Sequence, residues 1–142
     1  LSRSSERSVE PIASARPAKS MNACVKSQEA AQEYFFVEGC FITELSNSSD
    51  DADVSVVRAR VEPGKTTRWH CLRDTGERYV MLQGVGSVEI GDLPPHRVTA
   101  GDVVIIPPQV RQRISNIGTD DLVFLAICSP RFTGAAYVDL EA

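Results

Sequence analysis

The feature that most constrains the fold is a succession of short strand-like runs with no helical pattern between them. Stretches rich in β-branched and aromatic residues recur, such as VSVVRARV, RYVMLQG and LVFLAIC. Turn-forming pairs separate them, including Pro63-Gly64, Gly101-Asp102 and Pro107-Pro108. Runs at this spacing predict eight or nine strands in an antiparallel, all-β sandwich or barrel. The chain shows no internal repeat of the kind found in a propeller or solenoid.

The chain of 142 residues suits one domain. Residues 1–20 are rich in Ser, Arg and Pro, which predicts a disordered tail. No methionine precedes Met21, so this tail is either added or upstream-translated sequence, or a basic targeting arm. Residues 21–34 are expected to form a short helical entry, because SQEAAQEY begins with the N-cap candidate Ser27 and contains good helix formers. Residues 35–142 are then the barrel domain.

Charge and hydropathy narrow the class of partner. The formal net charge of −4 argues against nucleic acid, because phosphate binding needs a clustered positive surface. No run approaches the roughly 18 apolar residues that span a bilayer, so no membrane partner is expected. The four cysteines, Cys24, Cys40, Cys71 and Cys128, lie far apart, which is typical of idle thiols in a reducing compartment. The sequence therefore predicts a soluble, cytoplasmic protein.

Two segments carry a matching spacing of glycine, polar and proline positions. The first, PGKTTRWHCLRDTGERYVMLQG, holds Gly64, His70, Glu77 and Gly84. The second, GDVVIIPPQVRQRISN, holds Gly101, Pro107, Gln112 and Asn116. Together they resemble the paired motifs of the cupin superfamily over about residues 35–130. The resemblance implies a cupin-type antiparallel jelly-roll β-barrel, with the short N-terminal helix in front of it.

The departures from the family pattern concern the metal ligands. The resemblance implies a metal held by two histidines and a glutamate from the first motif and one histidine from the second. His70 and Glu77 match the first histidine and the glutamate, but Leu72 and Gln112 stand where the other two histidines are expected. Gln109 also replaces a turn glycine. Two of the four implied ligands are therefore present.

Strand alternation predicts which side chains face the barrel interior. Side chains two residues apart share a face of a strand, so the interior set is expected to include Arg68, His70, Leu72, Glu77, Tyr79, Met81, Gln112 and Ile114. An imidazole, a carboxylate and an amide oxygen can form an open ligand set for Mn, Fe, Ni or Zn. The predicted metal ligands are accordingly His70, Glu77 and Gln112.

A second interpretation needs no metal. His70 and Glu77 can form a buried hydrogen-bonded pair that Gln112 completes. The lumen is then a small-molecule pocket lined by Leu72, Met81 and Ile114, in which Arg68 favours a carboxylate or phosphate ligand. Both interpretations stay open at this point.

The predicted function is correspondingly broad. In a catalytic version, an isomerase, cyclase or dioxygenase-like enzyme, Glu77 or Tyr79 moves a proton on a small organic substrate. The alternative is a ligand-binding or sensory module without turnover. Phe132 and Tyr137, beyond the last expected strand, are candidates to cover an edge or the barrel mouth. A homodimer is expected because family members often pair through sheet edges and edge strands need covering.

Overall fold

The computed structural model describes residues 21–142, and the tail predicted for residues 1–20 lies outside this range. Within residues 21–142 the chain forms eleven strands: β1 (Glu33–Phe36), β2 (Cys40–Ser46), β3 (Ser55–Val61), β4 (His70–Leu72), β5 (Gly76–Gln83), β6 (Val85–Ile90), β7 (His96–Thr99), β8 (Val103–Ile106), β9 (Gln112–Asn116), β10 (Leu122–Ser129) and β11 (Tyr137–Asp139). Three short 3-10 turns, at Gln28–Ala30, Ser49–Asp51 and Gly134–Ala136, are the helical elements of this range. No helix among these residues is long and apolar enough to cross a membrane.

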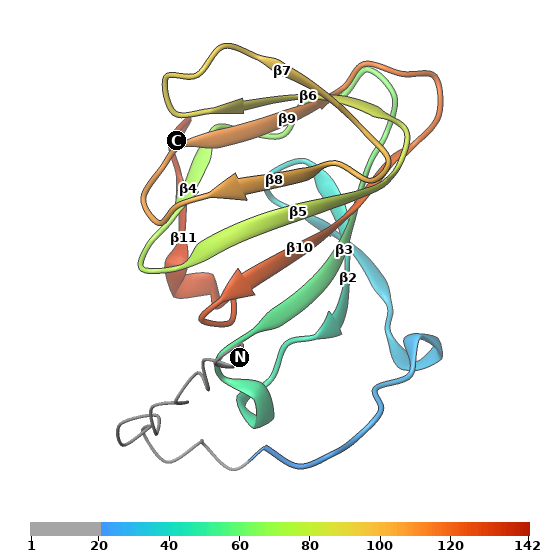
Figure 1. The fold of residues 1–142 in the computed structure, drawn as a ribbon, viewed down its shortest axis with the longest axis vertical. Coiled ribbons are helices and arrows are strands. Elements are labelled where there is room, and N and C mark those ends of the chain that lie inside the picture. The colour runs from blue at the N-terminus through green and yellow to red at the C-terminus, as the bar shows by residue number, and fades with distance from the viewer. Residues whose placement is uncertain (1–20) are drawn as a thin grey trace, which may run out of the picture.

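The strands build two antiparallel sheets. One has six strands in the order β1-β2-β3-β10-β5-β8, and the other has five in the order β11-β4-β9-β6-β7. Figure 1 shows β6, β7 and β9 above, and β5, β10, β3 and β2 below. Strands that are neighbours in a sheet are often distant in sequence, as with β3 beside β10 and β4 beside β9. The predicted all-β, antiparallel jelly-roll fold is confirmed.

The core lies between the sheets and follows the alternation of the strands. In β10, Leu122, Phe124, Ala126 and Cys128 are buried while the residues between them are more exposed. Because successive side chains of a strand point to opposite faces, one face of β10 supplies the core and the other faces outward. β9 repeats the pattern with buried residues at every second position, including Ile114.

The short helix predicted in the entry segment, residues 21–34, does not form. The only helical element there is the 3-10 turn at Gln28–Ala30, and residues from Glu33 onward form β1. Tyr34 pairs with Ile42 of β2 in this sheet. Good helix formers such as the alanines here have a preference of only a few tenths of a kcal/mol, which sheet pairing and packing override.

Several motif positions prove to be structural. Gly84 has a φ of 88°, and a Cβ there would lie 2.7 Å from the carbonyl oxygen of Asp121, so no other residue fits. Asn116 is buried, and its Nδ2 donates to the carbonyl oxygens of Val61 and Asp120. Gln109 adopts a φ of 64°, the left-handed conformation expected where it replaces a turn glycine. These residues shape the turns that hold the barrel.

Candidate functional site

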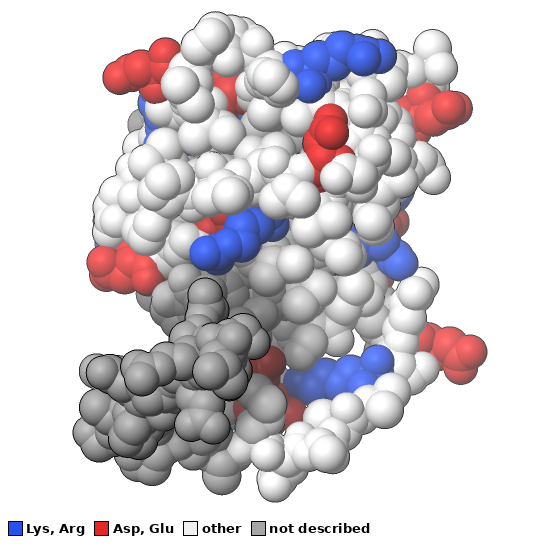
Figure 2. Space-filling model, in the orientation of Figure 1, with Lys and Arg blue, Asp and Glu red and all other residues white. Residues whose placement is uncertain are grey.

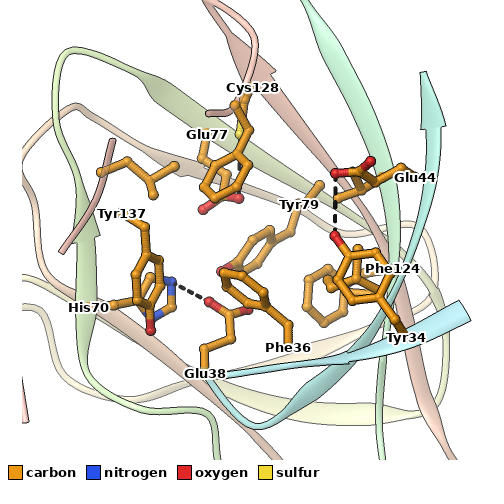
Figure 3. A pocket seen from close by; sticks show the side chains of 16 residues that line it. Tyr34, Phe36, Glu38, Glu44, His70, Glu77, Tyr79, Phe124, Cys128 and Tyr137 are labelled. Atoms are coloured by element: carbon orange, nitrogen blue, oxygen red, sulfur yellow. Dashed lines mark hydrogen bonds and ion pairs between the residues drawn. The ribbon is translucent and has the colours of Figure 1, made fainter. Parts of the chain in front are cut away.

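A cavity lies inside the barrel between the two sheets (Figure 3). Its volume is about 520 Å³ when the part that opens to solvent is included. Much of its wall is aromatic, from Tyr34, Phe36, Tyr79, Phe124, Phe132 and Tyr137. The opening is marked by Tyr34 and Glu44, which line the cavity yet are exposed. Phe132 and Tyr137, expected to cover an edge or the mouth, both belong to the wall.

The ionisable groups of this cavity are mostly acidic. Three carboxylates line it, from Glu38, Glu44 and Glu77, together with the imidazole of His70. In the part of the chain that the structure describes, no lysine or arginine is among the lining residues. The cavity therefore favours neutral or positively charged ligands and repels anions.

His70 begins β4 and is held from both of its ring nitrogens. Nδ1 lies 2.7 Å from the carbonyl oxygen of Arg68, and Nε2 lies 3.1 Å from Oε2 of Glu38. Because a carbonyl oxygen only accepts, Nδ1 carries a hydrogen. Nε2 is then the ring nitrogen that faces Glu38. The ring also stacks on Tyr137, with centroids 5.3 Å apart.

Glu38 is the functional residue that the sequence reasoning missed. It lies in the turn between β1 and β2, and its carbonyl oxygen accepts a hydrogen bond from the amide of Arg68 at 2.8 Å. This bond places the turn beside Arg68, two residues before the start of β4. The Glu38 side chain accepts from the Cys40 thiol at 3.0 Å through Oε1 and meets His70 through Oε2. A carboxylate inside the apolar run FFVEGCF was the available signal.

The predicted pairing of His70 with Glu77 is therefore wrong, because Glu38 occupies that place. Glu77 lies in β5 opposite Cys128 of β10, whose thiol donates to Oε2 at 3.6 Å. Although the residue as a whole is half-buried, its Oε1 is fully enclosed and has no hydrogen-bond partner. Burial raises the pKa of Glu77 to about 7, the negative charge of Glu38 adds to the rise, and Gln112 and His70 partly offset it.

Tyr79 and Gln112 connect the two sheets across the interior. The Tyr79 hydroxyl, from β5, donates to Oε1 of Gln112, from β9. Both residues are buried, with 3% and 1% of their surface exposed. Burial raises the pKa of Tyr79 well above its ordinary value, so the phenol stays protonated and acts as a donor. Nε2 of Gln112 is buried without a partner.

The remaining predicted ligand-binding residues divide into two groups. Leu72 lines the cavity. Met81 and Ile114 face the interior as predicted, but they lie in the packed core and not in the cavity wall. Alternation fixes the face of a strand, whereas the depth at which the barrel closes depends on how the sheets pack.

The prediction that Arg68 faces the lumen is contradicted by its position. Arg68 does not line the cavity, and its Nε lies 3.1 Å from Oδ2 of Asp139 at the surface. β4 begins only at His70, so the strand alternation used for the prediction does not extend back to Arg68. A carboxylate ligand held by Arg68 is therefore not supported.

The predicted metal ligands do not fit a metal centre as they are arranged. Nε2 of His70 engages Glu38, and Oε1 of Gln112 accepts from Tyr79, so two of the three donor atoms already have protein partners. Among residues 21–142, no group of three or more His, Cys, Asp or Glu side chains is placed to hold a metal ion. The arrangement therefore does not match the predicted ligand set.

The outer face of the five-stranded sheet carries a separate cluster. The guanidinium groups of Arg111 and Arg113 lie 4.6 and 4.5 Å from the ring centroid of Trp69. Arg113 also pairs with Glu89 at 3.1 Å. These arginines point away from the lumen, as their alternation with Gln112 predicts. On the face shown in Figure 2, basic and acidic side chains are interspersed, without a continuous basic surface.

Fold and site together define a small jelly-roll barrel protein with an acidic and aromatic interior cavity. Residues 57–128 match the sequence profile of the Cupin domain, and the chain belongs to this family. Among curated proteins, none matches the chain.

Solved structures share the fold at low sequence identity. Streptomyces Pac13, described as a nucleoside dehydratase, is 18% identical with a TM-score of 0.70 over 84% of this chain and 92% of its own. KdgF from Halomonas sp. is 16% identical with a TM-score of 0.67 over 77% of this chain and 96% of its own. Oxalate decarboxylase from Lactobacillus farciminis is 21% identical with a TM-score of 0.68 over 79% of this chain and 34% of its own. These likenesses show the shared fold.

Proposed function

We propose that the protein is an enzyme of the lyase or isomerase class that transfers protons on a small organic molecule in this cavity. The observation that carries the proposal is the contrast between two carboxyl groups facing one cavity. Glu38 has polar partners at both oxygens, the Cys40 thiol at Oε1 and the His70 imidazole at Oε2. Glu77 is enclosed, has one oxygen without a partner and has its pKa raised to about 7. Two carboxyl groups in opposite environments are the usual arrangement of a base and an acid.

The His70–Glu38 pair is the base. Within this pair the carboxyl group of Glu38, whose Oε2 lies 3.1 Å from Nε2 of His70, accepts the substrate proton. The carbonyl of Arg68 holds the ring orientation through Nδ1. In the first step the pair removes a proton from a carbon next to a substrate carbonyl, and the electron pair of that C–H bond forms an enolate.

Glu77 is the acid in the second step. With a pKa of about 7, a large fraction of its carboxyl groups carries a proton at neutral pH. That proton passes to a leaving hydroxyl, which departs as water, or to the neighbouring carbon, which completes an isomerisation. Tyr79 remains a neutral phenol beside Gln112 and serves as a hydrogen-bond donor.

Nearby folds are compatible with such chemistry. Pac13 is described as a nucleoside dehydratase, and loss of water is one of the two outcomes proposed here. At 18% identity this likeness carries the fold alone, and the proposal rests on the side chains of this cavity. The homodimer and the cytoplasmic location expected from the sequence stay predictions.

The first step can be tested by hydrogen exchange with solvent. The protein is incubated in D₂O with uncharged aldoses and ketoses, their 2-amino forms and their phosphates, and deuterium uptake next to the carbonyl is followed by mass spectrometry. We expect uptake in uncharged or amino compounds and none in the phosphates. Glu38→Gln should abolish uptake, whereas Glu77→Gln should keep uptake and lose the final product.

A surface variant provides the control. Glu62 is exposed, so Glu62→Gln should behave as the wild type. Wild-type uptake no higher than that of Glu38→Gln in every compound contradicts the proposal. Binding of these compounds without uptake would instead support the ligand-binding module that the sequence left open.

A further inference from the structure

We propose that the aromatic wall of the cavity is a cage for an alkylammonium group, so that the natural ligand is a small organic cation. The proposal names the substrate class of the proton-transfer site described above and to that extent rests on the proposed function. Binding of the cation is independent of turnover, and it is tested on its own below.

The walls of this cage are aromatic rings at steep angles to one another. The Phe36 ring lies 6.1 Å from Phe132 at an interplanar angle of 85° and 5.2 Å from Tyr137 at 78°. Phe36 comes from β1, Phe132 from the segment after β10 and Tyr137 from β11, so the fold assembles them from distant parts of the chain. The rings of each pair pack edge to face and together form a continuous aromatic part of the cavity wall, and an aromatic face that lines the cavity attracts a cation.

The charge at the opening matches a cation. Glu44 lines the cavity beside the Tyr34 hydroxyl, which donates to its Oε1 at 3.3 Å (Figure 3). Its other side-chain partner is the neutral amide of Asn47 at 3.4 Å, so the described structure leaves the carboxylate without a positive partner. A cation that enters at the opening is therefore attracted by the Glu44 carboxylate.

The inner charges point the same way. Within the described part of the chain, the one basic group in the cavity wall is His70, and its imidazole already pairs with Glu38. Glu77 adds a further carboxyl group whose Oε1 has no partner. A ligand with a positive group at the mouth offsets this acidic excess, whereas a neutral apolar ligand leaves it uncompensated and an anion increases it.

The test compares two probes of equal shape that differ in charge. Choline carries a trimethylammonium group, and 3,3-dimethylbutan-1-ol replaces its nitrogen with carbon. Titration calorimetry and thermal shift on the full chain should show that choline binds roughly tenfold more tightly than the neutral probe. Equal affinity for the two, or no detectable binding of choline at tens of millimolar, would overturn the proposal.

Matched variants locate the cage. Phe36→Leu, Phe132→Leu and Glu44→Gln should each weaken choline binding several-fold. Phe35→Leu is the control, because Phe35 precedes Phe36 in β1, is exposed and packs on Phe41 on the other face of the sheet. Choline binding that is unchanged in all three cage variants refutes this location. If Phe36→Leu fails to fold, Phe132→Leu and Glu44→Gln decide the question.

The two proposals fail separately. Choline binding by a protein that gives no deuterium uptake would support the cage and refute the proposed enzyme activity. Deuterium uptake in uncharged compounds without choline binding would support the enzyme and refute the cage.

Discussion

Replacement of Glu77 by glutamine should change how the stability of the protein depends on pH. The surroundings of Glu77 favour its protonated form in the folded state, where its pKa is about 7 instead of the ordinary 4.5. Between these two values the folded state binds more protons than the unfolded state. The stabilisation that protonated Glu77 contributes is therefore fully present below pH 4.5 and is lost as the pH rises through about 7.

The expected loss follows from the size of that change. Raising the pKa from 4.5 to about 7 corresponds to about 3 kcal/mol of unfolding free energy between acidic and alkaline pH. Glu77→Gln cannot ionise and has nearly the same shape, so this loss should be absent from the variant. Urea unfolding of both proteins at pH 5 and pH 8 captures most of this change, about 2.5 kcal/mol, and groups that titrate in both proteins cancel.

A surface variant serves as the control for this comparison, and one outcome contradicts the prediction. Glu62→Gln removes an exposed carboxylate and should follow the wild-type curve. If the unfolding free energies of wild type and Glu77→Gln change in parallel from pH 5 to pH 8, Glu77 is ionised in the folded protein at neutral pH, and its role as the acid is refuted.

Three further predictions follow from the same contacts. Tyr79→Phe leaves Oε1 of Gln112 without its donor and should destabilise the protein by about 1–2 kcal/mol in urea unfolding; no change would mean that the bond between the sheets is not formed. Zn²⁺, Mn²⁺ and Ni²⁺ should shift the Tm of wild type and His70→Ala equally, because Nε2 is already engaged; a shift confined to the wild type would restore the predicted ligand set. Arg68→Ala should leave choline affinity unchanged and stability little altered, because the pair with Asp139 is partly exposed; lost binding in calorimetry would place Arg68 at the site.

The sequence predicted the fold because its signals are local. Alternating apolar residues and turn pairs define strands without reference to the rest of the chain. The same alternation correctly predicted which side chains face the interior: His70, Glu77, Tyr79 and Gln112. The prediction of a helix in residues 21–34 was wrong because Tyr34 belongs to a strand whose partner lies further along the chain.

The errors in the site arise where the local pattern ends. Alternation was extended to Arg68, although β4 begins two residues later. Met81 was assigned to the cavity from its strand face alone, although it lies in the packed core. A strand pattern gives the direction of a side chain but carries no information on where the barrel interior is filled.

The sequence by itself determined the two-sheet barrel and the side chains that point into it, since both depend on spacing along single strands. Only the tertiary structure decided that Glu38 is the partner of His70 and that aromatic rings from β1 and β11 meet in one cavity wall. Those contacts join segments that are far apart in the chain. They depend on how the sheets pack, which no local pattern records.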